Sequence, residues 1–156
     1  RELIKPGFFG HLFKILDKKE MARLTQEVLD RLKITIKSVK QPVGTLSGGQ
    51  RQAVAIGKAI AWGSKIVILD EPTNALGVEE SEKVLQLIRE IAAEGISVIL
   101  ISHTLPYVMD VCDRMTVFRL GNTITTLNRD DITLDDLVAW ITGSRTLDGT
   151  TDAQEA

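Results

Sequence analysis

Polar residues that could act together on a phosphate follow two apolar segments of the chain. Asp70 and Glu71 come directly after residues 66–69, and His103 comes shortly after residues 97–101. A carboxylate at a strand end can hold Mg²⁺ through water, a second can orient a water for attack, and an imidazole can hydrogen-bond a phosphate oxygen. The alternatives are a hydrated acidic turn and a histidine whose nitrogens are satisfied by nearby backbone.

The turn at residues 47–49 could bind an anion. Ser47 is a good N-cap for a helix over residues 48–61. The first turn of such a helix presents free backbone N–H groups and the positive end of the helix dipole, the arrangement that binds phosphate. Gly48 and Gly49 carry no side chain that would keep a phosphate from the backbone. The alternative is a capped helix with no ligand.

Hydrophobic spacing predicts the elements that position these residues. The apolar runs at 66–69 and 97–101 predict strands of the kind buried on both faces of a parallel sheet. Alternating strands and helices predict an α/β fold, in which reactive residues lie past the carboxyl ends of strands. The other predicted elements are a helix capped by Asp17, helices at 79–93 and near 106–112, a strand at 115–120 with a hairpin partner at 123–127, and a helix at 134–141 begun by Thr133.

Composition excludes several classes of protein. The 156 residues carry a formal net charge of −2, so no general attraction to nucleic acid or anionic lipid is expected. A single cysteine allows no internal disulfide. No apolar run approaches the ~18 residues that span a bilayer.

Three segments of the sequence resemble the motifs of ATP-binding cassette (ABC) ATPases. LSGGQ at residues 46–50 resembles the signature motif, IVILDEPT at 66–73 resembles the Walker B motif, and His103 resembles the switch histidine. The order and spacing of these motifs are highly specific, and the resemblance covers about residues 1–127. It implies a RecA-like P-loop NTPase core of α/β class with an inserted helical subdomain.

The resemblance also implies a division of the chain. Residues 1–62 resemble the helical subdomain with the signature helix, residues 63–143 resemble the second half of the RecA-like core, and residues 144–156 are expected to be a disordered tail. The sequence contains no G-x-x-x-x-G-K-[ST] motif. We therefore expect a partial core without its Walker A half, cut from a longer parent ATPase and inactive on its own.

Each motif residue receives a role from the resemblance. Asp70 would support Mg²⁺, Glu71 would polarise the attacking water, and His103 would contact the γ-phosphate of ATP. The signature residues would contact the ATP held by a second, facing cassette in a head-to-tail pair: Ser47, Gly48, Gly49 and Gln50.

Two short runs are similar to those of monosaccharide importer ATPases: RELIKP at residues 1–6 and ALGVEES at 75–81. Gly77 stands where the family usually has aspartate. The similarity implies an ATP-binding subunit that drives uptake of a small sugar from the cytoplasmic face of a membrane, bound to transmembrane permease subunits. One alternative is a soluble cassette ATPase of translation or DNA repair, for which a basic surface or long coiled-coil insertions would be expected. The other is an inactive dimerisation or regulatory module.

The missing Walker A strand carries a structural expectation. In the family that strand lies between the strand ending near His103 and the strand at 115–120, so its absence would leave two apolar edges unpaired. Unpaired edges pair readily with other chains. We therefore expect strand exchange, association or a changed strand order.

Overall fold

The computed structural model describes residues 3, 16–61 and 63–145 and divides the chain into two compact units. The first unit lies within Arg1–Ile99 and the second within Leu100–Ala156. Most of the predicted tail lies outside the described residues. The division predicted at residues 62 and 143 stays a prediction.

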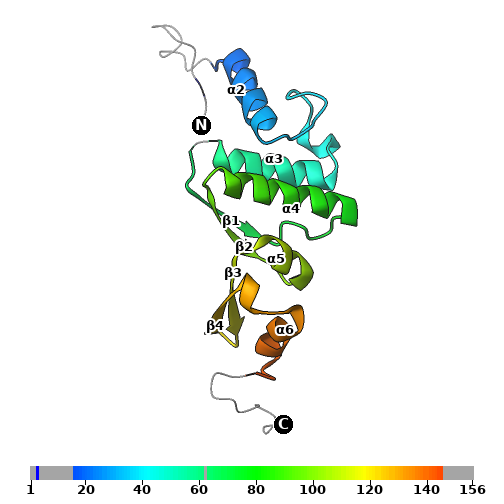
Figure 1. Ribbon diagram of the computed structural model, residues 1–156. Coiled ribbons are helices and arrows are strands. Elements are labelled where there is room, and N and C mark those ends of the chain that lie inside the picture. Colours follow the sequence, from blue (N-terminus) through cyan, green and yellow to red (C-terminus); the bar gives the residue numbers. More distant parts are fainter. Residues whose placement is uncertain (1–2, 4–15, 62, 146–156) are drawn as a thin grey trace. The chain divides into compact units, whose positions relative to one another are not determined.

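Helices α3 (Gly48–Ile60) and α4 (Val78–Ala93) lie side by side in the first unit, next to α2 (Lys18–Arg31) and a short 3₁₀ turn, η1 (Val43–Thr45) (Figure 1). Asp17 caps α2 as predicted, since its carboxylate accepts the Glu20 N–H at 3.0 Å. No helix in the described part of the chain is both long enough and apolar enough to cross a membrane.

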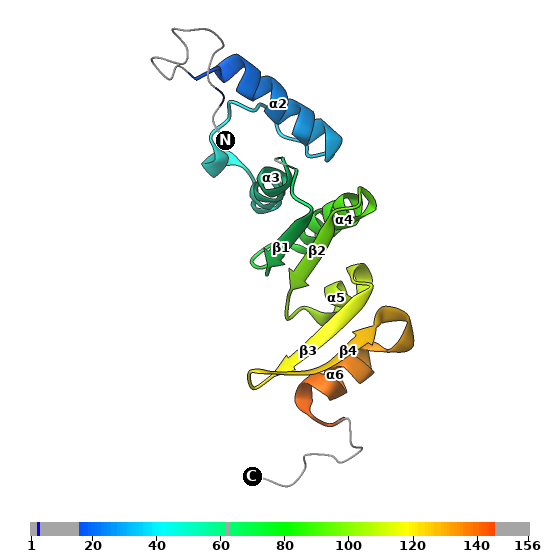
Figure 2. The ribbon, with the colours of Figure 1, turned by 90° about the vertical axis from the view of Figure 1, so that its left-hand side faces the viewer.

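Strands β1 (Ile66–Asp70) and β2 (Ser97–Ile101) form a two-stranded sheet, and α4 connects them (Figure 2). The Ser97 N–H donates to the Lys65 carbonyl at 2.9 Å. Both residues stand at the start of their strands, so the strands run parallel. The predicted strand–helix–strand order is confirmed.

One expectation about this sheet is wrong. Val67 and Leu69 are buried, but Ile66 and Ile68, which alternate with them, are 59% and 64% exposed. Ile99 on β2 is 50% exposed. The apolar run in β1 is therefore buried on one face only, because nothing among the described residues covers the other face.

The second unit contains a hairpin between two helices. Its elements are α5 (Leu105–Val111), β3 (Arg114–Arg119), β4 (Asn122–Asn128), the 3₁₀ turn η2 (Arg129–Asp131) and α6 (Leu134–Thr142). Strands β3 and β4 pair antiparallel, which confirms the predicted hairpin. Leu120 and Gly121 form the turn with φ of 48° and 80°, the geometry that joins two strands most tightly.

A small core holds the second unit together. Its buried residues come from α5, β3 and α6: Met109, Met115, Val117, Leu137 and Trp140. Thr133 caps α6 in a reciprocal box with Asp136, and Gly143 ends the helix with φ of 83°. The Arg145 guanidinium lies 5.6 Å from the centroid of the Trp140 ring and 2.7 Å from the Asp136 carboxylate.

The burial of α4 predicts the effect of a truncation. Ile91 is 0% exposed, so Ile91→Ala is expected to lower the free energy of unfolding by about 2–5 kcal/mol, since the cavity adds to the lost transfer energy. Val78→Ala on the same helix is the control, because Val78 is 82% exposed. Urea unfolding followed by circular dichroism measures both. Equal losses for the two variants would contradict the packing described.

The α6 cap predicts a pH dependence. Hydrogen bonds from the Thr133 N–H and hydroxyl, with Arg145 nearby, lower the pKa of Asp136. A lowered folded-state pKa contributes stability above the ordinary carboxyl value, and this stability is lost as pH falls through the folded value. The difference in melting temperature between the natural chain and Asp136→Ala should therefore be largest near pH 7 and shrink below about pH 4. Asp135→Ala is the control, and a pH-independent difference would contradict the argument.

Candidate functional site

The signature turn, residues 46–50, begins α3 with a complete capping box. Ser47 has extended backbone, with φ −65° and ψ 166°, and its hydroxyl accepts the Gln50 N–H at 3.3 Å. In return the Gln50 Oε1 accepts the Ser47 N–H at 3.1 Å. The Ser47 cap that the sequence predicted is therefore confirmed.

The Gln50 side chain is held at both ends. Its Nε2 donates to the Thr35 carbonyl at 2.9 Å while its Oε1 accepts from Ser47. Because one partner is an acceptor and the other a donor, the two bonds fix the orientation of the amide. A separate hydrogen bond, from the Arg51 guanidinium to the Leu46 carbonyl at 2.6 Å, holds the first residue of the signature turn.

The two glycines of the turn are packed against their own chain. A Cβ on Gly48 would lie 2.6 Å from the Leu76 Cδ2, and one on Gly49 would lie 3.2 Å from the Glu80 Cβ. These glycines therefore allow α3 to approach α4 closely, a reason that the sequence did not reveal. Leu76 and Glu80 were not predicted, because their contacts with the turn are distant in sequence.

The acidic residues lie in a second turn, residues 70–77, called here the carboxylate turn. Asp70 is exposed at the end of β1, and Glu71 has a left-handed backbone with φ of 46°. The Asn74 N–H closes the turn on the Glu71 carbonyl at 3.0 Å, and Ala75 is again left-handed at φ 58°. Each left-handed non-glycine residue costs about 1 kcal/mol, so the chain reverses here at a cost in local strain.

The carboxylate turn offers one side chain that could serve as a ligand of Mg²⁺. Magnesium is usually held by one or two carboxylates together with substrate phosphates and waters. The exposed Asp70 carboxylate could supply such a ligand. Within the residues that the structure describes, no cluster of three or more His, Cys, Asp or Glu side chains forms an all-protein metal cage.

His103 follows β2 and is exposed. Its carbonyl accepts the Leu105 N–H at 3.1 Å, at the start of α5. The Thr104 N–H donates to the Ser102 hydroxyl at 3.1 Å, which fixes the same turn. His103 belongs to the second unit and Glu71 to the first, so their convergence on one phosphate stays a prediction.

An open groove of about 1220 Å³ lies beside the signature turn, between residues 32–35, the first turns of α3 and residues 77–90. Three of its four acidic side chains form ion pairs, two with lysines and one with Arg89. The Lys33 ammonium lies 3.0 Å from the Glu90 carboxylate, and its hydrogen bond lowers the Glu90 pKa. A hydrogen bond from Lys83 lowers the Glu79 pKa in the same way. The rim of the groove is therefore ionic and largely paired.

Known proteins are similar to this chain in sequence and in fold. Residues 6–74 match the family described as ABC transporter. The fructose import ATP-binding protein FrcA of Rhizobium meliloti is 47% identical over 146 residues, which are 93% of this chain and 56% of that protein. The ribose import ATP-binding protein RbsA 3 of Rhizobium meliloti (strain 1021) is 36% identical over 136 residues, 87% of this chain and 27% of that protein.

A solved structure agrees with these sequence matches. The cbiO1 protein of Clostridium perfringens, described as part of the ABC transporter complex cbiONQ, is 29% identical with a TM-score of 0.66. The match covers 88% of this chain and 55% of that one. This chain therefore spans about half or less of the length of the relatives that it matches. With the signature and Walker B segments folded as described, the chain belongs to the family of ABC transporter ATPases.

Proposed function

We propose that this chain supplies the signature turn and the carboxylate turn of an ABC importer subunit that hydrolyses ATP to take up a small sugar. The observation that carries the proposal is the 47% identity to a fructose import ATP-binding protein over 146 residues. An alignment of that length within 156 residues spans both turns and His103. The ribose and the xylose/arabinose import proteins among the relatives support a sugar as the transported solute.

Hydrolysis of ATP assigns a different task to each side chain. Asp70, at the end of β1, would hold Mg²⁺ through water, and the metal would neutralise charge on the phosphates. Glu71 would orient the attacking water, and His103 would donate a hydrogen bond to the γ-phosphate. The left-handed backbone at Glu71 supports its role, because residues in such conformations concentrate at functional sites.

The signature turn would act on a nucleotide held by a second cassette, in a head-to-tail pair. Ser47, Gly48, Gly49 and Gln50 stand at the start of a helix of 13 residues, where backbone N–H groups and the helix dipole favour a phosphate. The Gln50 amide is held within its own subunit by Ser47 and Thr35. Its contribution would therefore be to hold the turn in shape while backbone N–H groups face the phosphate.

The remaining assignments concern the whole assembly. The pair of cassettes would bind transmembrane permease subunits at the inner face of the cell membrane, as in an importer. ATP and Mg²⁺ would be bound chiefly by a phosphate loop, a motif that the 156 residues do not contain. The alternative function, a soluble cassette ATPase of translation or DNA repair, receives no support from the relatives named above.

The proposal predicts the effect of neutralising Glu71. In an assembly that contains this chain, Glu71→Gln is expected to lower the rate of ATP hydrolysis by about 10²-fold or more, because the amide cannot polarise the water. Binding of ATP should persist, since Glu71 does not hold the phosphates. Phosphate release and equilibrium nucleotide binding are the two measurements.

Glu79→Gln is the matched control, since Glu79 is exposed on α4 and pairs only with Lys83 among the contacts described. Unchanged hydrolysis in Glu71→Gln, or an equal loss in Glu79→Gln, would overturn the role of Glu71. Failure of every assembly containing this chain to bind ATP would instead favour an inactive dimerisation or regulatory module.

The free edge of β2 predicts association of the chain by itself. β2 pairs with β1 and with no other strand in the described part of the chain. We expect size-exclusion chromatography to show species above 17.2 kDa that grow with concentration. Ile99→Lys should reduce the association, whereas Val78→Lys, on an exposed helical position, should not. A stable monomer at all concentrations would contradict strand exchange.

A further inference from the structure

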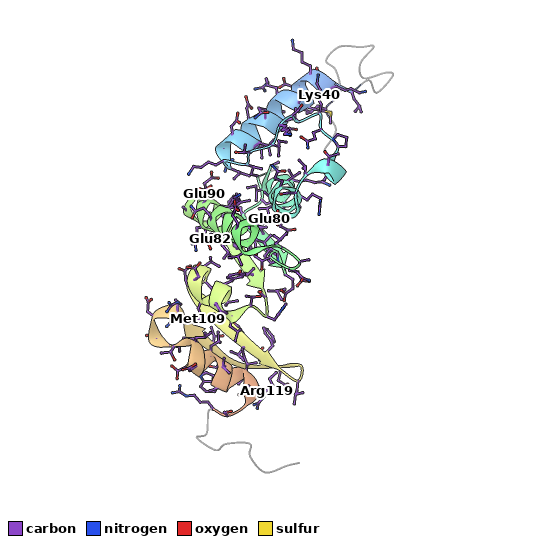
Figure 3. The ribbon with its side chains drawn as sticks, turned by 90° about the vertical axis from the view of Figure 1, so that its right-hand side faces the viewer. Lys40, Glu80, Glu82, Glu90, Met109 and Arg119 are labelled. Atoms are coloured by element: carbon purple, nitrogen blue, oxygen red, sulfur yellow. The ribbon has the colours of Figure 1, made fainter. Side chains whose placement is uncertain are left out.

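Glu80 contacts both turns of the candidate site. A Cβ on Gly49 would lie 3.2 Å from the Glu80 Cβ, 3.5 Å from its Cγ and 3.5 Å from its carbonyl oxygen. The side-chain stem of Glu80 is therefore the surface on which Gly49, a buried residue, rests. Figure 3 labels Glu80 on α4, close to α3.

The other end of the same side chain reaches the carboxylate turn. The Glu80 Oε2 accepts the Gly77 N–H at 3.4 Å, where the turn passes into α4. That oxygen also lies 3.9 Å from the position of a Cβ on Gly48. One side chain thus touches residues of the signature turn and the last residue of the carboxylate turn.

Two features make this contact more than a helix cap. The carboxylate turn contains left-handed Glu71 and Ala75, and strained backbone persists only where its surroundings hold it. Leu76, from the same turn, lies directly against Gly48. Both turns are therefore set against each other through Leu76 and Glu80, with the smallest possible residues on the α3 side.

We propose that Glu80 is a positioning residue that fixes the signature turn relative to the carboxylate turn. Its methylene groups support Gly49, and its carboxylate holds Gly77, so that a movement of one turn is transmitted to the other. The catalytic consequence rests on the function proposed above; the structural coupling does not.

Amide exchange in the 156-residue chain tests the coupling. The reporters are the Gln50 N–H, bonded to the Ser47 hydroxyl, and the Arg51 N–H, bonded to the Ser47 carbonyl at 2.9 Å. Glu80→Ala is expected to accelerate their exchange about tenfold, since local opening governs exchange at this position. Glu80→Gln keeps the stem and an acceptor oxygen and should stay within about threefold of the natural chain.

Glu82→Ala is the matched control, because it also removes a carboxylate from α4 (Figure 3), one that faces Arg89 at 3.5 Å. Equal acceleration in Glu80→Ala and Glu82→Ala, or none in either, would overturn the proposal.

If Glu80→Ala does not fold, Glu80→Met tests the proposal instead, because it keeps the stem and loses the bond to Gly77. Exchange at Gly77 should then rise about threefold and exceed the rise at Gln50; no change at Gly77 would overturn the proposal.

A kinetic measurement tests the consequence. In an ATP-hydrolysing assembly that contains this chain, Glu80→Ala is expected to lower kcat about tenfold and to leave KM for ATP within about threefold. Glu80→Gln, which keeps the stem and an acceptor oxygen, should retain the kcat of the natural chain. If no such assembly hydrolyses ATP, the proposed function fails, while the exchange measurement still decides the role of Glu80.

Discussion

The close approach of α3 to α4 is the constraint on which the first unit depends. At Gly48 and Gly49 helix α3 presents no side chain, and the space is occupied by Leu76 of the carboxylate turn and Glu80 of α4. Close packing of this kind leaves few alternative positions. The same contact therefore sets where the signature turn begins and where the carboxylate turn ends.

Local hydrogen bonds explain why so much of the fold could be predicted. Asp17, Ser47 and Thr133 each bond a backbone N–H three residues ahead, so the sequence alone indicates where the helices start. The hairpin was equally local, since Leu120 and Gly121 join strands that are neighbours in the chain. The motif residues could be located by the same logic, because they follow elements with clear hydrophobic patterns.

What could not be predicted depends on contacts distant in sequence. Glu80 meets Gly49 although most of α3, strand β1 and the carboxylate turn lie between them in the chain, and no spacing rule indicates that contact. The backbone of Glu71 is equally unpredictable, because a positive φ at a residue other than glycine is set by its surroundings. The prediction for the burial of β1 was wrong for a related reason. An apolar run shows that both faces of a strand can be buried, but whether they are buried depends on other segments that pack against them.

The exposed isoleucines of the β1–β2 sheet have a calorimetric consequence. Ile66, Ile68 and Ile99 are half or more in contact with water in the folded chain. Heat capacity rises on unfolding in proportion to the apolar area newly hydrated. Because these side chains are already largely hydrated in the folded chain, they add little to that area. The folded chain should therefore have a smaller heat-capacity increment than its length suggests, and a stability that varies more gently with temperature.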